Sequence, residues 1–281
     1  MTTVLAAIDG SIFSQSVASH AAWSADRLSA SVELMQVLGR REQAADNRSG
    51  RLVAGARRQL LEELVALDAQ RSKLLMKQAR LDLEEMAAIV AAAGVEATTT
   101  LRHGDLLETL ASREEQAELI VVGKRGQAAD FAKLHLGSNL ERILRGASRP
   151  VLVAARAFSE IRRFMIAFDG RAGALASVEA VSRSALFHQL DCVIAMAGDP
   201  DERARRSLDQ AAAQLSAAGL APQVKILPGP AKTAIPAAAE QEAADLLVMG
   251  AYGRSRLRTL VIGGTTSEVI RESAIPVLIY K

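Results

Sequence analysis

Short apolar runs alternate with longer amphipathic stretches along almost the whole chain. Continuous apolar runs predict buried strands, and apolar residues repeated at spacings of three and four predict helices. In the first half the expected strands are 4–8, 31–37, 96–101, 118–122 and 151–155, and the expected helices are 14–29, about 52–93, 105–117 and 138–146. In the second half the expected strands are 163–168, 191–197, 223–227, 245–249 and 276–280, and the expected helices are 173–188, 201–218, 231–243 and 265–273.

Strands that alternate with helices of this length predict right-handed crossovers and parallel sheets with helices on both faces. The expected fold class is therefore α/β, with two tandem doubly wound five-stranded parallel sheets. In such a sheet a ligand binds outside the carboxyl ends of the strands. The residues expected at those ends are Asp9, Val37 and Gly123 in the first half and Asp169, Ala197 and Gly250 in the second.

The second half of the chain repeats the first. Thr3–Gly10 matches Arg163–Gly170, and the segment from Gly123 to Pro150 matches the segment from Gly250 to Pro276. The sequence predicts two homologous domains, 1–157 and 158–281. Because residues 156–160 form a short joint without a Pro-, Gly- or Ser-rich linker, we expect the two domains to pack together as a pseudo-dimer.

The first copy contains an additional charged segment at about residues 40–80. Between Arg40 and Arg80 there are ten Arg or Lys residues and five Asp or Glu residues, with leucines at roughly helical spacing. The simpler interpretation is a long amphipathic helix that covers its own domain and exposes a basic face. The alternative is an arm that docks a partner.

Composition excludes several classes of protein. A hydrophobic content of 49% with 3% aromatic residues fits an aliphatic α/β core. A net charge of +2 argues against electrostatic, sequence-independent binding to nucleic acid. No apolar run approaches the roughly 18 residues of a membrane span, and no basic-then-apolar leader opens the sequence. Since Cys192 is the single cysteine, no intrachain disulfide can form, and we expect a cytoplasmic protein.

Each copy carries a glycine motif directly after a buried strand. The motif has the form Gly-x-x-Gly, followed about ten residues later by a Gly-Ser or Gly-Gly-Thr pattern that opens a helix. Glycines allow backbone amides to approach a ligand closely, and a helix start offers free N–H groups and a positive dipole end to phosphate. The alternative is that these glycines only turn the chain.

With the Asp-Gly-Ser start after the first strand and the Pro-Val-Leu-Val ending, the whole chain resembles a tandem universal stress protein. The resemblance implies an adenine-nucleotide-type, Rossmann-like fold and a site for ATP, ADP or AMP, with Mg²⁺ possible at the phosphates. In the first copy it places Asp9 and Val37 near ribose and adenine, Gly123 and Gly126 along the ribose and phosphates, and Gly137, Ser138 and Asn139 at the phosphates, with Ile8, Gly10, Ser11 and Val122 as neighbours.

The resemblance maps Asp169, Ala197, Gly250, Gly253, Gly263, Gly264 and Thr265 onto the same places in the second copy. The copies depart from the family pattern in different ways. The first has one extra residue between Gly126 and Gly137, but it keeps the Gly137-Ser138 pair. The second has Gly264 in place of the hydroxyl residue, so we expect the first copy to be the better ATP site.

The expected function is that of a stress-response sensor or adaptor which binds an adenine nucleotide in at least one domain and an unidentified protein partner. A slow ATPase is the alternative enzyme class, although no side chain is evidently poised to activate water. A ligand-free interaction module with relic glycine loops is the other alternative. No catalytic residue and no metal site are expected, His103 is a candidate accessory ligand contact, and Cys192 is expected to be buried and inert.

The last strand of each copy, 151–155 and 277–281, is strongly apolar. An open apolar edge strand invites aggregation, so we expect these two strands to pair with each other around a pseudo-two-fold axis. Further homodimerisation through other surfaces stays open.

Overall fold

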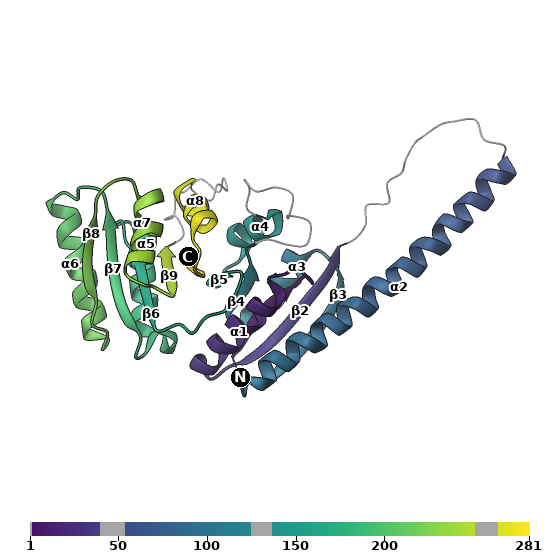
Figure 1. The fold of residues 1–281 in the computed structure, drawn as a ribbon, viewed down its shortest axis with the longest axis horizontal. Coiled ribbons are helices and arrows are strands. Elements are labelled where there is room, and N and C mark those ends of the chain that lie inside the picture. The colour runs from purple at the N-terminus through teal and green to yellow at the C-terminus, as the bar shows by residue number, and fades with distance from the viewer. Residues whose placement is uncertain (1, 40–53, 125–136, 251–263) are drawn as a thin grey trace.

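The computed structural model describes residues 2–39, 54–124, 137–250 and 264–281. In these ranges ten strands form one sheet in the order β3-β2-β1-β4-β5-β10-β9-β6-β7-β8 (Figure 1). The strands are β1 (Thr3–Ile8), β2 (Ser31–Gly39), β3 (Ala97–Gly104), β4 (Ala117–Gly123), β5 (Val151–Ala154), β6 (Arg163–Ala167), β7 (Asp191–Ala197), β8 (Gln223–Leu227), β9 (Leu246–Gly250) and β10 (Val277–Tyr280). The predicted α/β class is confirmed, and the two five-stranded sheets are joined edge to edge.

The joint between the halves is an antiparallel pair of short strands. β5 and β10 pair with Leu152 opposite Leu278, and all other neighbouring strands pair in parallel. Both strands are completely buried. The predicted pairing of the two apolar edges is confirmed, because each edge satisfies the backbone groups of the other.

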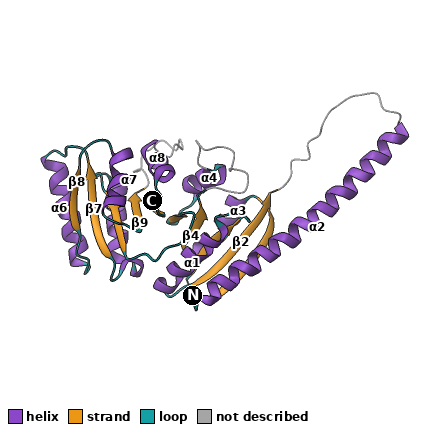
Figure 2. Ribbon diagram, in the orientation of Figure 1, coloured by secondary structure: helices purple, strands orange, loops and turns teal. Residues whose placement is uncertain are grey.

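Helices cover both faces of the sheet (Figure 2). One hydrophobic core lies under α1, α2, α5 and α6, the other lies under α3, α4, α7 and α8, and each core runs across both halves. The helices are α1 (Ser14–Leu28), α2 (Ala54–Ala92), α3 (Leu106–Ala111), α4 (Ser138–Gly146), α5 (Ala172–Arg183), α6 (Glu202–Ala217), α7 (Ala231–Gln241) and α8 (Gly264–Glu272). Among the described residues, no helix is both long and apolar enough to cross a membrane.

Two helices are shorter than the sequence predicts. α3 ends at Ala111, and residues Glu114–Gln116 form a separate 3₁₀ turn. The cause is distant in sequence, because the buried Glu114 carboxylate accepts hydrogen bonds from the backbone N–H and the hydroxyl of Ser148.

The predicted helix 173–188 likewise ends early, at Arg183, and a 3₁₀ turn follows at Ala185–Phe187. Ser184 accepts a hydrogen bond from the Leu186 N–H, and the guanidinium of Arg27 on α1 donates to the Leu186 carbonyl at 2.6 Å. The Leu186 carbonyl therefore accepts a hydrogen bond from the other half of the chain, whereas a continued α5 would use this carbonyl within the helix.

Among the described residues, the contacts of α2 with its own half lie near the C-terminal end of the helix. Ala79, Leu83, Met86 and Val90 are buried at helical spacing, whereas the leucines between residues 60 and 75 whose side chains are described are exposed. The expectation that the helix covers its own domain therefore holds for the last turns and is wrong for residues 60–75.

Candidate functional site

The strand register of the first half brings three predicted site residues to one edge. β1 and β2 pair so that Asp9, one residue beyond the last pair, is level with Val37. β1 and β4 pair so that Gly123 is level with Ile8. Asp9, Val37 and Gly123 therefore lie at the carboxyl ends of three adjacent parallel strands, where ligands of α/β sheets bind.

The second half reproduces this register. By the same extension beyond the last strand pairs, Asp169 is level with Ala197, and Gly250 is level with Phe168. The two halves thus place equivalent residues at equivalent positions of their sheets.

In the first half a tight turn follows β1. The Asp9 carboxylate accepts a hydrogen bond from the Ser11 N–H at 3.0 Å, and the Ser11 hydroxyl accepts one from the Phe13 N–H at 3.3 Å. Gly10 between them has a φ of 71°, a left-handed conformation that glycine adopts without steric cost. The turn holds Asp9 directly after the carboxyl end of β1.

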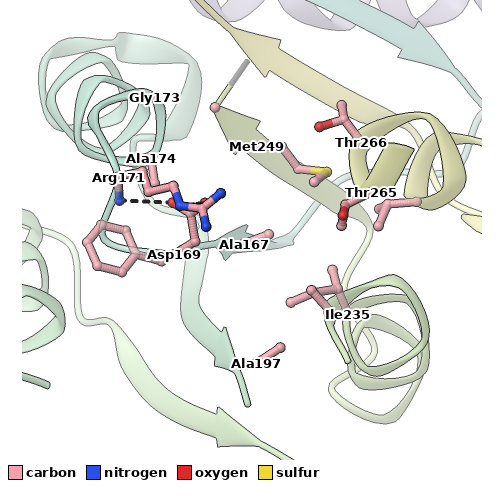
Figure 3. A pocket seen from close by; sticks show the side chains of 14 residues that line it. Ala167, Asp169, Arg171, Gly173, Ala174, Ala197, Ile235, Met249, Thr265 and Thr266 are labelled. Atoms are coloured by element: carbon pink, nitrogen blue, oxygen red, sulfur yellow. Dashed lines mark hydrogen bonds and ion pairs between the residues drawn. The ribbon is translucent and has the colours of Figure 1, made fainter. Parts of the chain in front are cut away.

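The second half has the same turn with a different side chain. Gly170 also has a φ of 71°, and Asp169 accepts a hydrogen bond from the Arg171 N–H at 3.0 Å. In addition, Arg171 Nε lies 3.7 Å from Asp169 Oδ2 (Figure 3). A guanidinium therefore occupies the position of the Ser11 hydroxyl and pairs with the carboxylate that the resemblance assigns to ribose and adenine.

Gly250 is required by a close approach of backbone. A Cβ atom added there would lie 2.2 Å from the carbonyl carbon and oxygen of Gly173 and 2.6 Å from the nitrogen of Ala174. Since such distances are far below van der Waals contact, only glycine fits at the end of β9 beside the start of α5.

A pocket opens at this edge of the second half (Figure 3). It contains four predicted positions, Asp169, Ala197, Gly250 and Thr265, while Gly264 begins α8 and does not line it. Gly253 and Gly263 lie outside the described residues. The other lining residues are Ala167, Phe168, Arg171, Gly173, Ala174, Ala231, Ile235, Met249, Thr266 and Val269.

Most of those other lining residues were not identified from the sequence. Phe168 and Met249 directly precede the predicted residues Asp169 and Gly250, and Thr266 directly follows Thr265. Their position next to predicted residues in the sequence could have identified them as lining residues. Ile235 on α7 is brought in by packing between helices, and a single sequence contains no signal for that contact.

At the phosphate end of the first half, Gly137 directly precedes α4. Ser138 is the first residue of this helix, and Asn139, the second, is exposed. Gly126 lies outside the described residues. The residues that the resemblance assigns to the phosphates therefore lie at the start of α4.

Two lysines cap helices across the joint between the halves. Lys124 Nζ donates to the carbonyl oxygens of Arg271 and Ser273 at the C-terminal end of α8, the latter at 2.9 Å. Lys281 Nζ donates to the Ala147 carbonyl at the end of α4. Cations are favourable at helix C-termini, so each half stabilises the phosphate-end helix of the other.

The remaining candidates contribute no reactive group. Cys192 is buried as expected, and burial raises the pKa of its thiol to about 12. His103 is exposed at the end of β3. In the parts of the chain that the structure describes, no cluster of three or more His, Cys, Asp or Glu residues is arranged to hold a metal ion.

Comparisons with known proteins agree with this architecture. A model of the universal stress protein family matches the chain twice, at residues 1–155 and 161–281. Universal stress protein Slr1230 of Synechocystis sp. is 36% identical over 287 residues, covering 100% of both chains.

Two solved structures share the fold over nearly the whole chain. A universal stress protein from Archaeoglobus fulgidus has a TM-score of 0.73 and 22% identity, covering 99% of this chain and 96% of that one. A putative universal stress protein from Pseudomonas aeruginosa has a TM-score of 0.62 and 18% identity, with 100% and 93% covered. From the two family matches and the full-length relative, the chain belongs to the universal stress protein family, once in each half.

Proposed function

We propose that this chain binds ATP, or the related nucleotides ADP or AMP, in at least one half, and that Mg²⁺ accompanies the phosphates. The observation that carries the proposal is the shared register of the two halves. It brings Asp9, Val37 and Gly123 to one sheet edge in the first half and Asp169, Ala197 and Gly250 to the equivalent edge in the second. In the second half Asp169, Ala197 and Gly250 line one pocket together with Thr265.

The chemistry of the pocket supports an adenosine-like ligand. Its walls combine apolar side chains, such as Ile235 and Met249, with the Asp169 carboxylate and the Thr265 hydroxyl. An apolar wall with a few convergent polar groups suits a flat heterocycle joined to a sugar. The start of α8 adds N–H groups and a positive dipole end near Thr265.

We propose the first half as the tighter site. Ser138 supplies a hydroxyl at the start of α4, whereas Gly264 supplies none at the start of α8. The extra residue between Gly126 and Gly137 opposes this ranking, because it can displace phosphate-facing amides.

We further propose that the chain acts as a cytoplasmic sensor or adaptor made of two domains, 1–157 and 158–281, and not as a metabolic enzyme. Nucleotide occupancy would then be read by a partner protein. A slow ATPase is the second candidate, and steady phosphate release well above that of a Gly137/Ser138 double variant would favour it.

Nucleotide extraction from natively purified protein, followed by calorimetric titration of the full chain with ATP, tests the proposal. We expect binding that Asp9→Ala combined with Asp169→Ala weakens at least tenfold. Asp209→Ala is the matched control, because Asp209 is an exposed carboxylate on α6, away from the sheet edge. Absence of extracted nucleotide and of titratable binding would favour the ligand-free interaction module.

A further inference from the structure

The exposed part of α2 carries leucines at an interval of seven residues, Leu60, Leu67, Leu74 and Leu81. Their exposed fractions are 49%, 61%, 62% and 51%, and Leu64 between the first two is 51% exposed. In Figure 1 this part of the helix extends beyond the end of the sheet. Such a long row of exposed leucines is costly in water unless another surface covers it.

The leucine row lies on a different side of α2 from the residues that pack on the sheet. The last turns of α2 pack on the sheet through Ala79, Leu83, Met86 and Val90. At about 100° per residue, the row turns from roughly 100° away from Ala79 at Leu60 to roughly 160° away at Leu81. A second helix can therefore approach the row without meeting the sheet that α2 covers.

The spacing matches the seam of a two-stranded coiled coil. In such a structure apolar residues alternate at spacings of three and four, and each of the two columns that they form repeats every seven residues. Here that seam runs through residues 60, 64, 67, 71, 74, 78 and 81, and leucine occupies all of these positions except Arg71 and Gln78. We propose that a second copy of this chain covers the row, with residues 60–81 of the two α2 helices forming an antiparallel coiled coil.

Charge complementarity favours the antiparallel direction. With Leu64 opposite Leu74 of the second copy, Arg71 lies opposite Leu67 of that copy and next to its Asp68. The flanking Glu63 then faces Lys77 of the second copy. Opposite charges at flanking positions set partner choice and direction in coiled coils.

The parallel direction is disfavoured by the same residues. It would place Arg71 opposite Arg71 of the second copy and Glu63 opposite Asp68. Both contacts bring like charges together, which is destabilising across a seam.

Light scattering and sedimentation equilibrium of the full chain test the assembly. We expect a particle of twice the 29.8 kDa chain mass. Leu67→Glu with Leu74→Glu should raise the dissociation constant at least a hundredfold. The control Ala66→Glu with Ala69→Glu adds the same charge at exposed positions outside the seam and should stay dimeric. A chain that is monomeric at all concentrations, or a seam variant that associates like the control, would overturn the proposal.

A charge exchange tests the direction. Glu63→Lys should weaken association by placing two lysines opposite each other, and adding Lys77→Glu should restore it. In a parallel pair Glu63→Lys would instead strengthen association, because it removes the repulsion from Asp68. Strengthening by Glu63→Lys, or failure of the double variant to recover, would overturn the antiparallel arrangement.

Discussion

Lys124 donates a hydrogen bond to the carbonyl oxygen of Ser273 at 2.9 Å, so the residue directly after Gly123 in the first half holds the end of α8 in the second. From the second half, Lys281 Nζ donates to the carbonyl oxygen of Ala147 at the end of α4, so each half holds the end of a helix in the other.

Lys124→Met should destabilise the chain, because it removes the ammonium group and keeps the rest of the unbranched side chain. Hydrogen bonds to a charged group are worth about 1.5–3 kcal/mol, so we expect the free energy of unfolding to fall by about 2 kcal/mol. Urea denaturation measures the change. Lys232→Met, at an exposed position on α7, is the control and should change stability by less than about 0.5 kcal/mol. Equal effects of the two variants would contradict the cross-half role.

Exchanging the hydroxyl between the two helix starts should exchange the two affinities. Ser138→Gly removes a donor from the proposed tighter site and should weaken ATP binding there by roughly one to two orders of magnitude. Gly264→Ser should strengthen the second site. Calorimetric titration of the full chain with ATP measures the affinities of the two sites. If Ser138→Gly leaves the tighter site unchanged, loop spacing matters more than the hydroxyl.

Gly250→Ala should be strongly destabilising, because its methyl group would overlap the backbone of Gly173. We expect a loss of about 3 kcal/mol or more in the free energy of unfolding. Gly264→Ala is the control, since a Cβ there meets nothing within 4 Å, and it should change the free energy of unfolding by no more than about 1 kcal/mol. Similar thermal midpoints for the two variants would contradict the proposed close approach.

The strands and the edge at which their carboxyl ends meet could be predicted because they depend on local patterns. The run before Asp9 is a strand in any context, and the repeat at Asp169 fixes the second copy by comparison. The register that brings Asp9 level with Val37 is given by the structure and agrees with the expectation that both lie at strand ends. The β5–β10 pairing followed from two apolar edges that need partners.

The helix ends and much of the pocket wall could not be predicted, because they depend on contacts between distant residues. Glu114 turns inward to reach Ser148, and Arg27 reaches the carbonyl of Leu186 across the joint. Local helix propensity predicts neither contact. The exposure of the leucines on α2 could not be predicted for the same reason, since an amphipathic pattern does not indicate which surface covers its apolar face.

His20 gives a pH dependence of stability. The residue is fully buried in α1, its Nδ1 lies 2.7 Å from the Ser16 carbonyl oxygen, and its ring meets Phe158 edge to face. Burial lowers the pKa of its imidazole from 6.5 to about 4, although the Ser16 hydrogen bond opposes the shift.

Since the unfolded chain binds this proton more readily, stability is complete above pH 6.5 and should fall as the pH drops toward 4. The loss is about 3 kcal/mol, from a shift of roughly two and a half pKa units. Urea denaturation between pH 7 and 4 measures it. His20→Leu should flatten the pH dependence by about that amount. His188→Leu, at an exposed site, should leave the slope as in the natural chain, and an unchanged slope in His20→Leu would assign the acid sensitivity to other groups.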